Sequence, residues 1–377
     1  MKTKRFAIFT AFAVIVCVAA GFGLKSKYDK QLPLDQIKLP PGFKIAIYAE
    51  VSNARSMVLS DNGTLFVGNR SEDKVYAVKD TDGDMVADIT YVIDEGLKMP
   101  NGVALKEGDL YVAEVSRILK YENIETNLAN PPEPVIIFDG YPTERHHGWK
   151  YIAFGPDGLL YVPVGAPCNI CDKEDEIYGS LTRINVDQPI PQIVASGIRN
   201  TVGFDWDPKT DKLWFTDNGR DMMGDDIPPC ELNAITERNQ HFGYPYCHGG
   251  EVLDPKFGKG KSCDDYTSPV WNFGAHVAPL GMSFYEGDMF PNTYASKIFV
   301  AQHGSWNRSK KSGYVIMALD HEATNVSKAE VFASGWLDKE SQKAWGRPVD
   351  VINMPDGSIL VSDDYADVIY RISYSEN

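Results

Sequence analysis

The chain has 377 residues, a formal net charge of −15 and a hydrophobic fraction of 43%. A chain of this length and apolar content can bury a large core, which excludes a disordered or fibrous protein. The negative charge argues against a nucleic-acid partner, because backbone phosphates would be repelled rather than neutralised.

The first 24 residues have the pattern of a targeting segment. Positively charged residues in 1–5 precede the stretch 6–24, which contains no charged residue. Its length suits either a cleaved signal peptide or a single membrane anchor. Both place the rest of the chain outside the cytoplasm, as a periplasmic or secreted protein. We therefore expect 1–24 to be a signal peptide or membrane anchor, 25–37 a linker, and 38–377 one domain.

A tight turn followed by a short apolar strand recurs six times along the chain. Each copy has Gly, Asp or Asn in the turn and then an alternating or continuous apolar run. The copies are residues 61–68, 107–113, 156–163, 209–216, 295–301 and 355–362. Six such units predict an all-β protein, a six-bladed β-propeller. Residues 43–48 form a spare strand before the first unit, and we expect this strand to close the ring by pairing into the C-terminal blade.

The segment 217–270 is long and rich in Gly, Pro and Asp, and loops of that length are usually functional. Beyond the leader the chain has an odd number of cysteines, so at least one is unpaired unless it pairs between molecules. Cys168 and Cys171 are three positions apart. They favour a local disulfide or two ordinary thiols, because no second pair of this kind would complete a zinc site. The five cysteines are Cys168, Cys171, Cys230, Cys247 and Cys263.

Propellers bind ligands over the central channel, where the innermost strands begin. Of the residues expected there, His147 can act as a general base because the ordinary pKa of imidazole lies near working pH. Arg199 and Arg347 can hold a polyanion or a developing oxyanion. The polar residues just before the expected innermost strands are Arg55, Asn101, His147, Arg199, Asn200 and Arg347.

Two acidic clusters offer the oxygen ligands that a hard cation prefers. The first cluster predicts a calcium site in a turn between strands. The alternative is an acidic turn that binds no ion. Its carboxylates are Asp80, Asp82, Asp84 and Asp88. The second cluster spans 217–233, opens the long segment, and is expected close to the channel mouth.

With these segments placed in the six-repeat arrangement, the chain resembles the soluble quinoprotein sugar dehydrogenases, in particular their sorbosone dehydrogenase-like and pyranose dehydrogenase-like branch. The resemblance covers about residues 38–375 and depends on an ordered set of segments rather than on any one of them. The set consists of His147 ahead of 154–158, and then 196–200, 213–219, 224–228, 241–247, 303–308 and 347–350.

The resemblance implies that pyrroloquinoline quinone lies over the channel with calcium, and that a sugar, aldose or related alcohol or aldehyde is oxidised by hydride transfer to the quinone. It implies that His147 takes the hydroxyl proton and that Arg199 stabilises charge on the reduced quinone. The implied calcium ligands are the backbone carbonyls of Gly219 and Arg220. A small sugar-like substrate and a separate electron acceptor, a cytochrome or a quinone, are the implied partners. The implied quinone-binding residues are Arg199, Asn200, Asn218, Trp306, Arg308 and Arg347.

The chain departs from this family at two positions. Ala166 stands where glucose dehydrogenases of this type have an acid that orients the histidine. Either another carboxylate, such as Asp172 or Glu174, would then have to orient His147, or His147 is less activated. Arg308 stands in place of an expected lysine, with two lysines close by.

Two other functions stay open on the residues alone. Six-bladed propellers also include calcium-dependent lactonases and esterases, which need Glu, Asn and Asp side chains around one central calcium. A propeller that serves only as a binding scaffold would present an apolar or aromatic face to its partner. The Arg and His residues expected at the channel suit a polyanionic cofactor better than either alternative.

Overall fold

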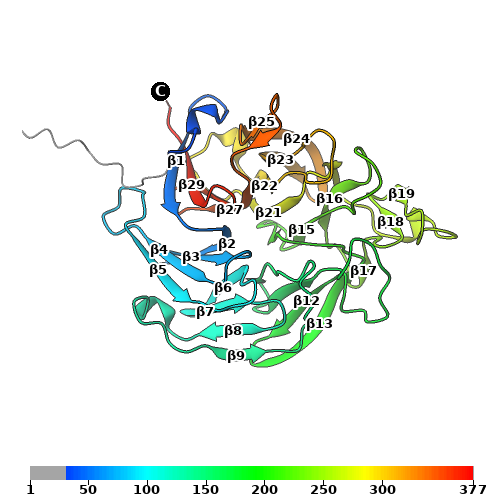
Figure 1. The fold of residues 1–377 in the computed structure, drawn as a ribbon, viewed down its shortest axis with the longest axis horizontal. Helices are drawn as coiled ribbons and strands as arrows, with labels where there is room; N and C mark the ends of the chain where they lie inside the picture. The colour runs from blue at the N-terminus through cyan, green and yellow to red at the C-terminus, as the bar shows by residue number, and fades with distance from the viewer. Residues whose placement is uncertain (1–30, 377) are drawn as a thin grey trace, which may run out of the picture. The chain divides into compact units, whose positions relative to one another are not determined.

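The computed structural model describes residues 31–376, whose strands form six sheets of four or five strands arranged around a centre (Figure 1). This arrangement confirms the predicted six-bladed β-propeller. No α-helix occurs in the described range, which contains only short 3-10 helices. They are η1 (Leu34–Gln36), η2 (Ile124–Thr126), η3 (Cys263–Asp265) and η4 (Asn292–Tyr294).

We number the blades in chain order, and each is an antiparallel sheet with its first strand innermost. Blade one contains β2 (Ala54–Leu59), β3 (Thr64–Asn69), β4 (Val75–Lys79) and β5 (Ile89–Asp94). Blade two contains β6 (Gly102–Lys106), β7 (Asp109–Ala113), β8 (Ile118–Tyr121) and β9 (Val135–Phe138). Blade three contains β10 (Ala153–Phe154), β11 (Leu160–Val164), β12 (Ser180–Asn185) and β13 (Gln188–Ser196).

Blade four contains β14 (Phe204–Trp206), β15 (Leu213–Asp217), β16 (Pro229–Ala234) and β20 (Trp271–Ala275). Blade five contains β21 (Pro279–Phe284), β22 (Ile298–Gln302), β23 (Val315–Glu322) and β24 (Asn325–Ser334). Blade six contains β27 (Pro348–Asn353), β28 (Ile359–Asp363) and β29 (Val368–Tyr374). Two short hairpins lie outside the blades, β18 (Cys247–His248) with β19 (Val252–Leu253), and β25 (Leu337–Asp338) with β26 (Lys343–Ala344).

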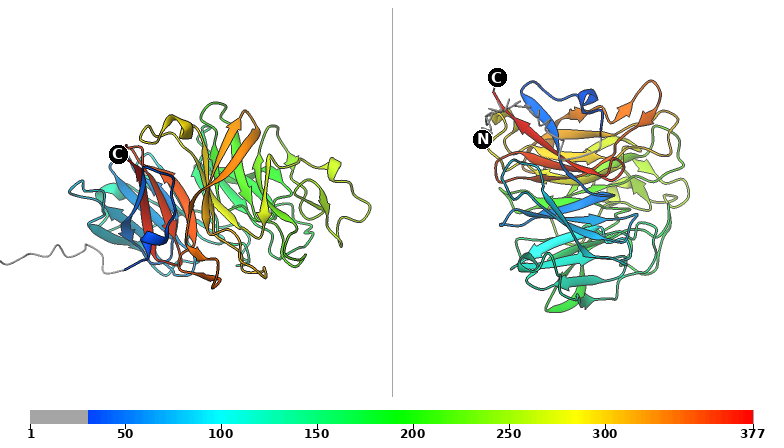
Figure 2. Two further views of the ribbon diagram at one scale, coloured as in Figure 1. Left: turned by 90° about the horizontal axis from the view of Figure 1, so that it is seen from above. Right: turned by 60° about the vertical axis from the view of Figure 1, so that its left-hand side comes forward.

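The first strand of the described chain closes the ring, as predicted. Strand β1 (Phe43–Glu50) pairs antiparallel with β29, with Phe43 opposite Tyr374 and Glu50 opposite Val368. Figure 2 shows the two strands side by side from both directions. The Phe43 ring packs against Phe290, Phe332 and Tyr374, with centroids 4.7–5.0 Å apart. This pairing removes the open edge that blade six would otherwise expose.

The core lies between neighbouring blades rather than in one central cluster. The second strands are the most buried, and β3 and β28 are buried along their whole length. The outer strands β5, β9 and β13 are more exposed to solvent than the second strands. The repeated turn has a positive φ at its tip, which glycine adopts most easily: Gly158 and Gly357 have φ angles of +73° and +82°. In two copies a non-glycine residue has this conformation, Asp211 at +55° and Ser296 at +60°.

The segment 217–270 is not one continuous insertion, because β16 lies within it as the third strand of blade four. The rest of the segment carries β17 (Gln240–His241), which pairs parallel with β13 and extends blade three. The sequence pattern missed β16 because its polar residues, such as Glu231 and Asn233, interrupt the expected apolar run.

The predicted leader, residues 1–24, lies outside the described residues. Within the described chain, no helix has the length and apolar character needed to cross a bilayer. The end of the predicted linker packs on the propeller, since Leu34 and Ile37 contact the core of blades five and six.

Candidate functional site

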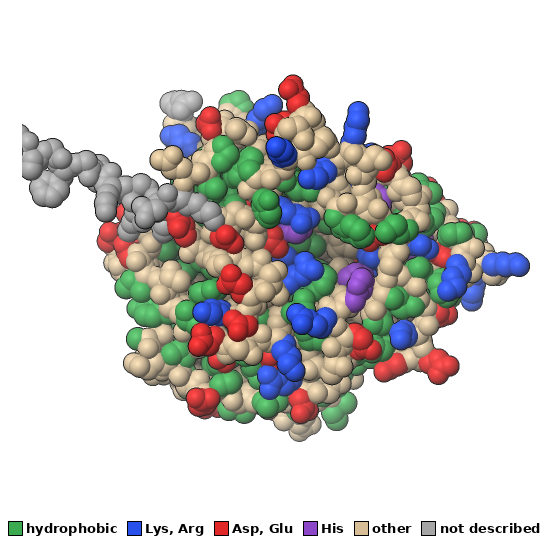
Figure 3. Space-filling model, in the orientation of Figure 1, with side chains coloured by type: hydrophobic (Ala, Val, Ile, Leu, Met, Phe, Trp, Pro, Cys, Tyr) green, Lys and Arg blue, Asp and Glu red, His purple; other side chains and the backbone are tan. Residues whose placement is uncertain are grey.

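A cavity of about 320 Å³ opens at the centre of the ring, on the face where the innermost strands begin. Figure 3 shows a hollow on this face with Lys, Arg and His side chains around it. In an antiparallel blade, the start of the first strand and the end of the second meet at one edge. The lining residues come from these two positions in several blades, together with nearby loops. They include Arg55, Arg70, His147, Trp149, Arg199, Asn200, Asn218, Gly219, Asp221, His276, His303, Trp306 and Arg347.

The structure therefore brings eight of the predicted site residues together: Arg55, His147, Arg199, Asn200, Asn218, Gly219, Trp306 and Arg347. Arg308 is not in the cavity lining, because its guanidinium donates to the backbone oxygens of Asp225 and Lys310 and to the Asp226 carboxylate. Arg220 also lies behind the lining. Asn101 supports it from below, since its side chain accepts a hydrogen bond from Arg55 at 2.6 Å.

The cavity concentrates positive charge. Four arginines line it, and Asp221 is the one lining carboxylate. Two of the arginines have a carboxylate partner, since Arg55 pairs with Asp364 at 2.6 Å and Arg199 with Asp221 at 3.4 Å. Within the described chain, the other two form no ion pair. Arg347 donates to the backbone oxygens of His303 and Gly304, and Arg70 lies 3.9 Å from the centroid of the Trp149 ring.

Burial lowers the pKa of Arg70 to about 10, with a smaller contribution from the neighbouring charge of Arg55. Burial also lowers the pKa of Arg199, and the carboxylates of Asp221 and Asp217 oppose this effect. A guanidinium in these surroundings stays protonated. The cavity can therefore hold an anion with several carboxylates at neutral pH.

His147 is held with one ring nitrogen free to accept a proton. Its Nδ1 lies 2.8 Å from the backbone oxygen of Ala166, so Nδ1 carries the hydrogen and Nε2 has the lone pair. Burial, and then the charge of Arg199, lower the pKa of His147 well below its usual value. The ring is therefore neutral at pH 7, as a proton acceptor must be.

The expectation that Asp172 or Glu174 orients His147 is wrong. Asp172 instead accepts a hydrogen bond from the Tyr246 hydroxyl at 2.8 Å, and both acidic side chains line a different pocket. The backbone carbonyl of Ala166 replaces a side-chain acid. This close approach needs Gly165, because a Cβ at that position would lie 2.6 Å from the Cβ of His147.

Arg199 is held by hydrogen bonds to Asn169, a residue that the sequence pattern did not identify. Its Nε and Nη2 donate to the backbone and side-chain oxygens of Asn169 at 2.8 and 3.0 Å, and its Nη1 donates to the Asn218 backbone oxygen. Asn169 also joins the Asp221 backbone, accepting from its N–H and donating to its carbonyl. Asn169 lies inside the short loop closed by the Cys168–Cys171 disulfide. It therefore links the arginine to the loop that carries Gly219 and Asp221.

We expect Asn169→Ala to weaken binding of an anionic cofactor about tenfold, because one charge-assisted hydrogen bond from Arg199 and both bonds to Asp221 are lost. Cofactor affinity should fall while the melting temperature stays within a few degrees. Asn169→Asp keeps the acceptors for Arg199 and should recover part of the affinity. Asn325→Ala, at the exposed first residue of β24 in blade five, is the control. Equal affinity in Asn169→Ala and the parent protein would contradict this role.

The loop after β15 presents backbone oxygens near the cavity. Gly219 lines it, and a Cβ there would lie 2.5 Å from the Pro229 backbone oxygen, so only glycine fits. The Arg220 side chain turns away and pairs with buried Asp254 at 2.5 Å, which also contacts His248. Asn218 fixes the start of the loop by donating to the backbone oxygens of Asn200 and Pro279. The loop is therefore anchored on both sides.

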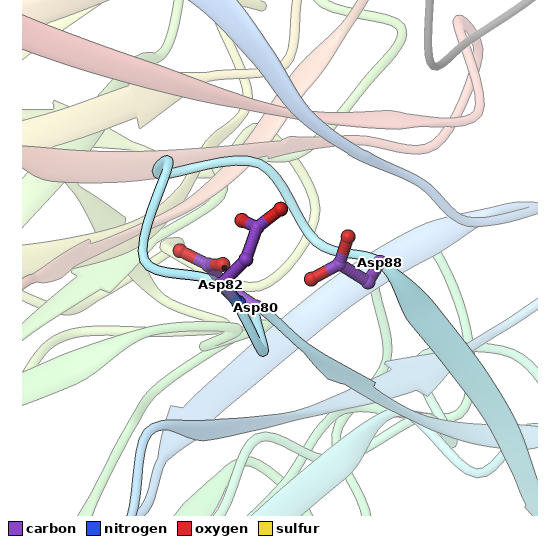
Figure 4. Close-up of side chains that lie close together, drawn as sticks. All are labelled: Asp80, Asp82 and Asp88. Carbon is purple, nitrogen blue, oxygen red and sulfur yellow. Dashed lines mark hydrogen bonds between the residues drawn. The ribbon is translucent and has the colours of Figure 1, made fainter.

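The predicted acidic cluster lies in the β4–β5 loop, at the opposite end of the blade from the cavity. Asp80, Asp82 and Asp88 have carboxylate oxygens within 4.8 Å of one another (Figure 4). Asp84 does not belong to this group, and its carboxylate accepts the N–H of Val86. A calcium site here stays a prediction.

The cysteine pairing agrees with the odd number of cysteines beyond the leader, because one cysteine is unpaired. Cys168 pairs with Cys171 and Cys247 with Cys263, while Cys230 is a free, buried thiol that lines the cavity. The Cys247–Cys263 disulfide ties the hairpin β18–β19 to η3.

The chain matches known dehydrogenases in sequence and in fold. Residues 116–370 match the family model for Glucose / Sorbosone dehydrogenase. An uncharacterized protein of Borreliella burgdorferi is 33% identical over 90% of this chain and 91% of its own length. A calcium structure of Trichoderma reesei Carbohydrate-Active Enzymes Family AA12 has a TM-score of 0.81 at 18% identity, covering 92% of this chain and 99% of that one. The holo form of the pyranose dehydrogenase PQQ domain from Coprinopsis cinerea has a TM-score of 0.75 at 16% identity, covering 89% and 97%.

The fold and the family match together define a β-propeller oxidoreductase of the sugar-oxidising type. The chain belongs to the glucose/sorbosone dehydrogenase family.

Proposed function

We propose that this protein is a calcium-dependent quinoprotein that oxidises a sugar or a related alcohol with pyrroloquinoline quinone. The observation that carries the proposal is the cavity, in which four arginines and one carboxylate surround a neutral, oriented histidine. A lactonase would need several carboxylates around one metal, and this lining does not supply them. A tricarboxylate cofactor matches the surplus of positive charge.

The residues present fit the quinone in a second respect. The indole N–H of Trp149 is buried and has no hydrogen-bond partner within the described chain. Because a buried donor without a partner is unfavourable, a ligand acceptor at this position would stabilise the site. Arg199, Asn200, Asn218 and Arg347 would bind the cofactor, with Arg55 and Arg70 as further cations and exposed Trp306 as a wall. Arg308 would contact the cofactor only from the rim of the cavity.

Calcium would bind at the backbone carbonyls of Gly219 and Arg220, since a hard cation prefers oxygen ligands. When bound, the quinone would supply a two-electron acceptor for a hydride, and calcium would supply a Lewis acid. The substrate carbon loses the hydride and its hydroxyl loses a proton, two electrons in all, and a carbonyl product forms. His147 Nε2 takes that proton. The Arg199 guanidinium stabilises the negative charge that develops beside it.

The electrons then pass to a separate acceptor, a cytochrome or a quinone. We also propose that the protein works outside the cytoplasm, released from or held by residues 1–24.

The test is a titration of the full-length apo-protein with pyrroloquinoline quinone, followed by absorbance, with and without calcium. We expect saturable binding at about 1 µM or tighter in calcium, and markedly weaker binding in chelator. The loaded protein should then reduce a dye with a panel of sugars. Arg183→Ala, which removes an arginine paired with Asp157 away from the cavity, should bind as the parent does. Failure to bind the quinone at micromolar concentration would overturn the proposal.

A further inference from the structure

A second, larger hollow adjoins the central cavity on the same face. It has a volume of about 780 Å³ and is formed by the loops that follow β3, β5, β7 and β9 in blades one and two. We call it the side pocket. Arg70 belongs to the lining of both the side pocket and the central cavity, so the two spaces meet at its side chain. The charged side chains of the side pocket are Arg70, Glu72, Asp73, Lys74, Lys98 and Arg145.

The side pocket is positively charged in a chain that is strongly negative. Its lining has four cations and two carboxylates, whereas the whole chain has a formal charge of −15. Lys74 is partly neutralised by Glu95 at 3.4 Å. Lys98 and Arg145 are exposed, and neither side chain has an ion pair or hydrogen bond in the described part of the protein. Figure 3 shows Lys and Arg side chains continuing from the central hollow across the adjoining surface.

The backbone of the side pocket is fixed by side-chain hydrogen bonds. Asn53 Oδ1 accepts the N–H groups of Arg70 and Ser71 at 3.0 and 2.7 Å. On the facing loop, the N–H of Lys98 donates to the Glu114 carboxylate at 2.7 Å. The guanidinium of Arg70 lies over the Trp149 ring. A preformed pocket of this volume is within the range that binds small molecules.

We infer that the side pocket binds an anionic group of the substrate, a carboxylate or a phosphate on the sugar. This inference rests on the proposed function. If the quinone fills the central cavity, the substrate hydroxyl must approach His147 from above, and the rest of the substrate extends past Arg70 into the side pocket. There Lys98 and Arg145 lack partners, and an anionic group on the sugar would supply one. A carboxylate or phosphate binds arginine in bidentate fashion and lysine as a point charge.

The test compares matched neutral and anionic sugars with the quinone- and calcium-loaded protein. Glucose is the neutral substrate, glucuronate carries a carboxylate, and glucose 6-phosphate carries a phosphate. We expect kcat/KM for at least one anionic sugar to exceed that for glucose by about tenfold or more, and the advantage to shrink as salt is raised. In Lys98→Glu/Arg145→Glu the ratio of anionic to neutral kcat/KM should fall at least about tenfold. Lys259→Glu changes the charge of an exposed lysine remote from both cavities and should leave that ratio unchanged.

Equal or higher kcat/KM for glucose in the parent protein would overturn the inference and leave the proposed dehydrogenase activity in place. So would a double variant with an unchanged ratio. Binding of glucuronate and glucose 6-phosphate to the apo-protein, measured by calorimetry against glucose, gives a readout that needs no quinone. Selective binding there, abolished in the double variant, would support the side pocket even if quinone binding fails. Absence of selective binding, together with absence of anionic preference in turnover, would reject it.

Discussion

Replacing His147 by asparagine should lower turnover by about 10²- to 10⁴-fold, the usual contribution of a positioned general base, while binding of quinone and calcium is retained. Asparagine is the best substitute because His147 has a φ angle of +51°, which asparagine tolerates better than alanine. The lost function is the Nε2 lone pair, since Nδ1 is occupied by the Ala166 carbonyl. Steady-state kinetics and the absorbance titration on the same preparation separate the two effects.

The pH profile gives an independent check on His147. The base accepts a proton only when it is neutral, and its pKa in the folded protein lies well below 6.5 because of burial and the charge of Arg199. Lowering the pKa extends the active form to lower pH. The acid limb of kcat/KM should therefore fall below pH 6.5, with no loss between pH 6.5 and 8 that is due to this group.

A second histidine in the cavity provides the discriminating variant. His303 also lines the cavity, but its Nε2 is bonded to the Asp364 carboxylate at 2.7 Å, so that nitrogen is engaged. His303→Asn should keep most of the turnover and the same acid limb. If His303→Asn loses turnover while His147→Asn keeps it, the assignment of the base is wrong. An acid limb at or above pH 6.5 in the parent would also contradict it.

The fold could be predicted from the sequence because its signals are local. A tight turn followed by an apolar strand is encoded within eight residues, and it recurs often enough to count blades. The spare strand 43–48 had no partner in sequence, so closure of the ring followed from the need to cover an edge. Strand β16, which the pattern missed, has polar side chains that are buried against residues outside the strand. Glu231, for example, accepts the N–H of Gly249.

The candidate site was only partly predictable, for a physical reason. His147, Arg199 and Arg347 precede innermost strands, so the repeat itself indicates where they lie. Arg70 comes from the loop after β3 and reaches the cavity only because the ring brings that loop to the centre. Trp149 and His276 precede the innermost strands β10 and β21, but the repeat pattern did not identify them.

The roles of backbone groups and the partners of individual side chains could be predicted even less well from the sequence. No residue type in the sequence indicates that the backbone carbonyl of Ala166 orients His147. The pairing of Arg308 with Asp226 depends on how the loop 224–228 folds. The Cys168–Cys171 spacing is visible in the sequence, but nothing in the sequence indicates that Asn169 between them bonds to Arg199.

Replacing Arg199 by alanine should weaken quinone binding by about 100-fold or more, since truncating a buried, hydrogen-bonded cation that faces an anion costs about 2–5 kcal/mol. Arg199 is buried, and its guanidinium is held by Asn169, Asn218 and Asp221. Its removal takes away a charge that no neighbour can replace in position. It also leaves Asp221 with one cationic neighbour fewer, so that the cavity becomes more negative.

Arg199→Lys separates charge from geometry. A lysine keeps the positive charge but has a single ammonium, which cannot meet the oxygens of Asn169 and Asn218 that the guanidinium fork reaches together. We expect an affinity between those of the parent and Arg199→Ala, and turnover still below the parent at saturating quinone, because stabilisation of developing charge depends on position. The melting temperature of each apo-variant is the control for folding. Parent-like affinity in a folded Arg199→Ala protein would show that the quinone does not bind in this cavity. A Lys variant no better than Ala would show that the fork, and not the charge, binds the cofactor.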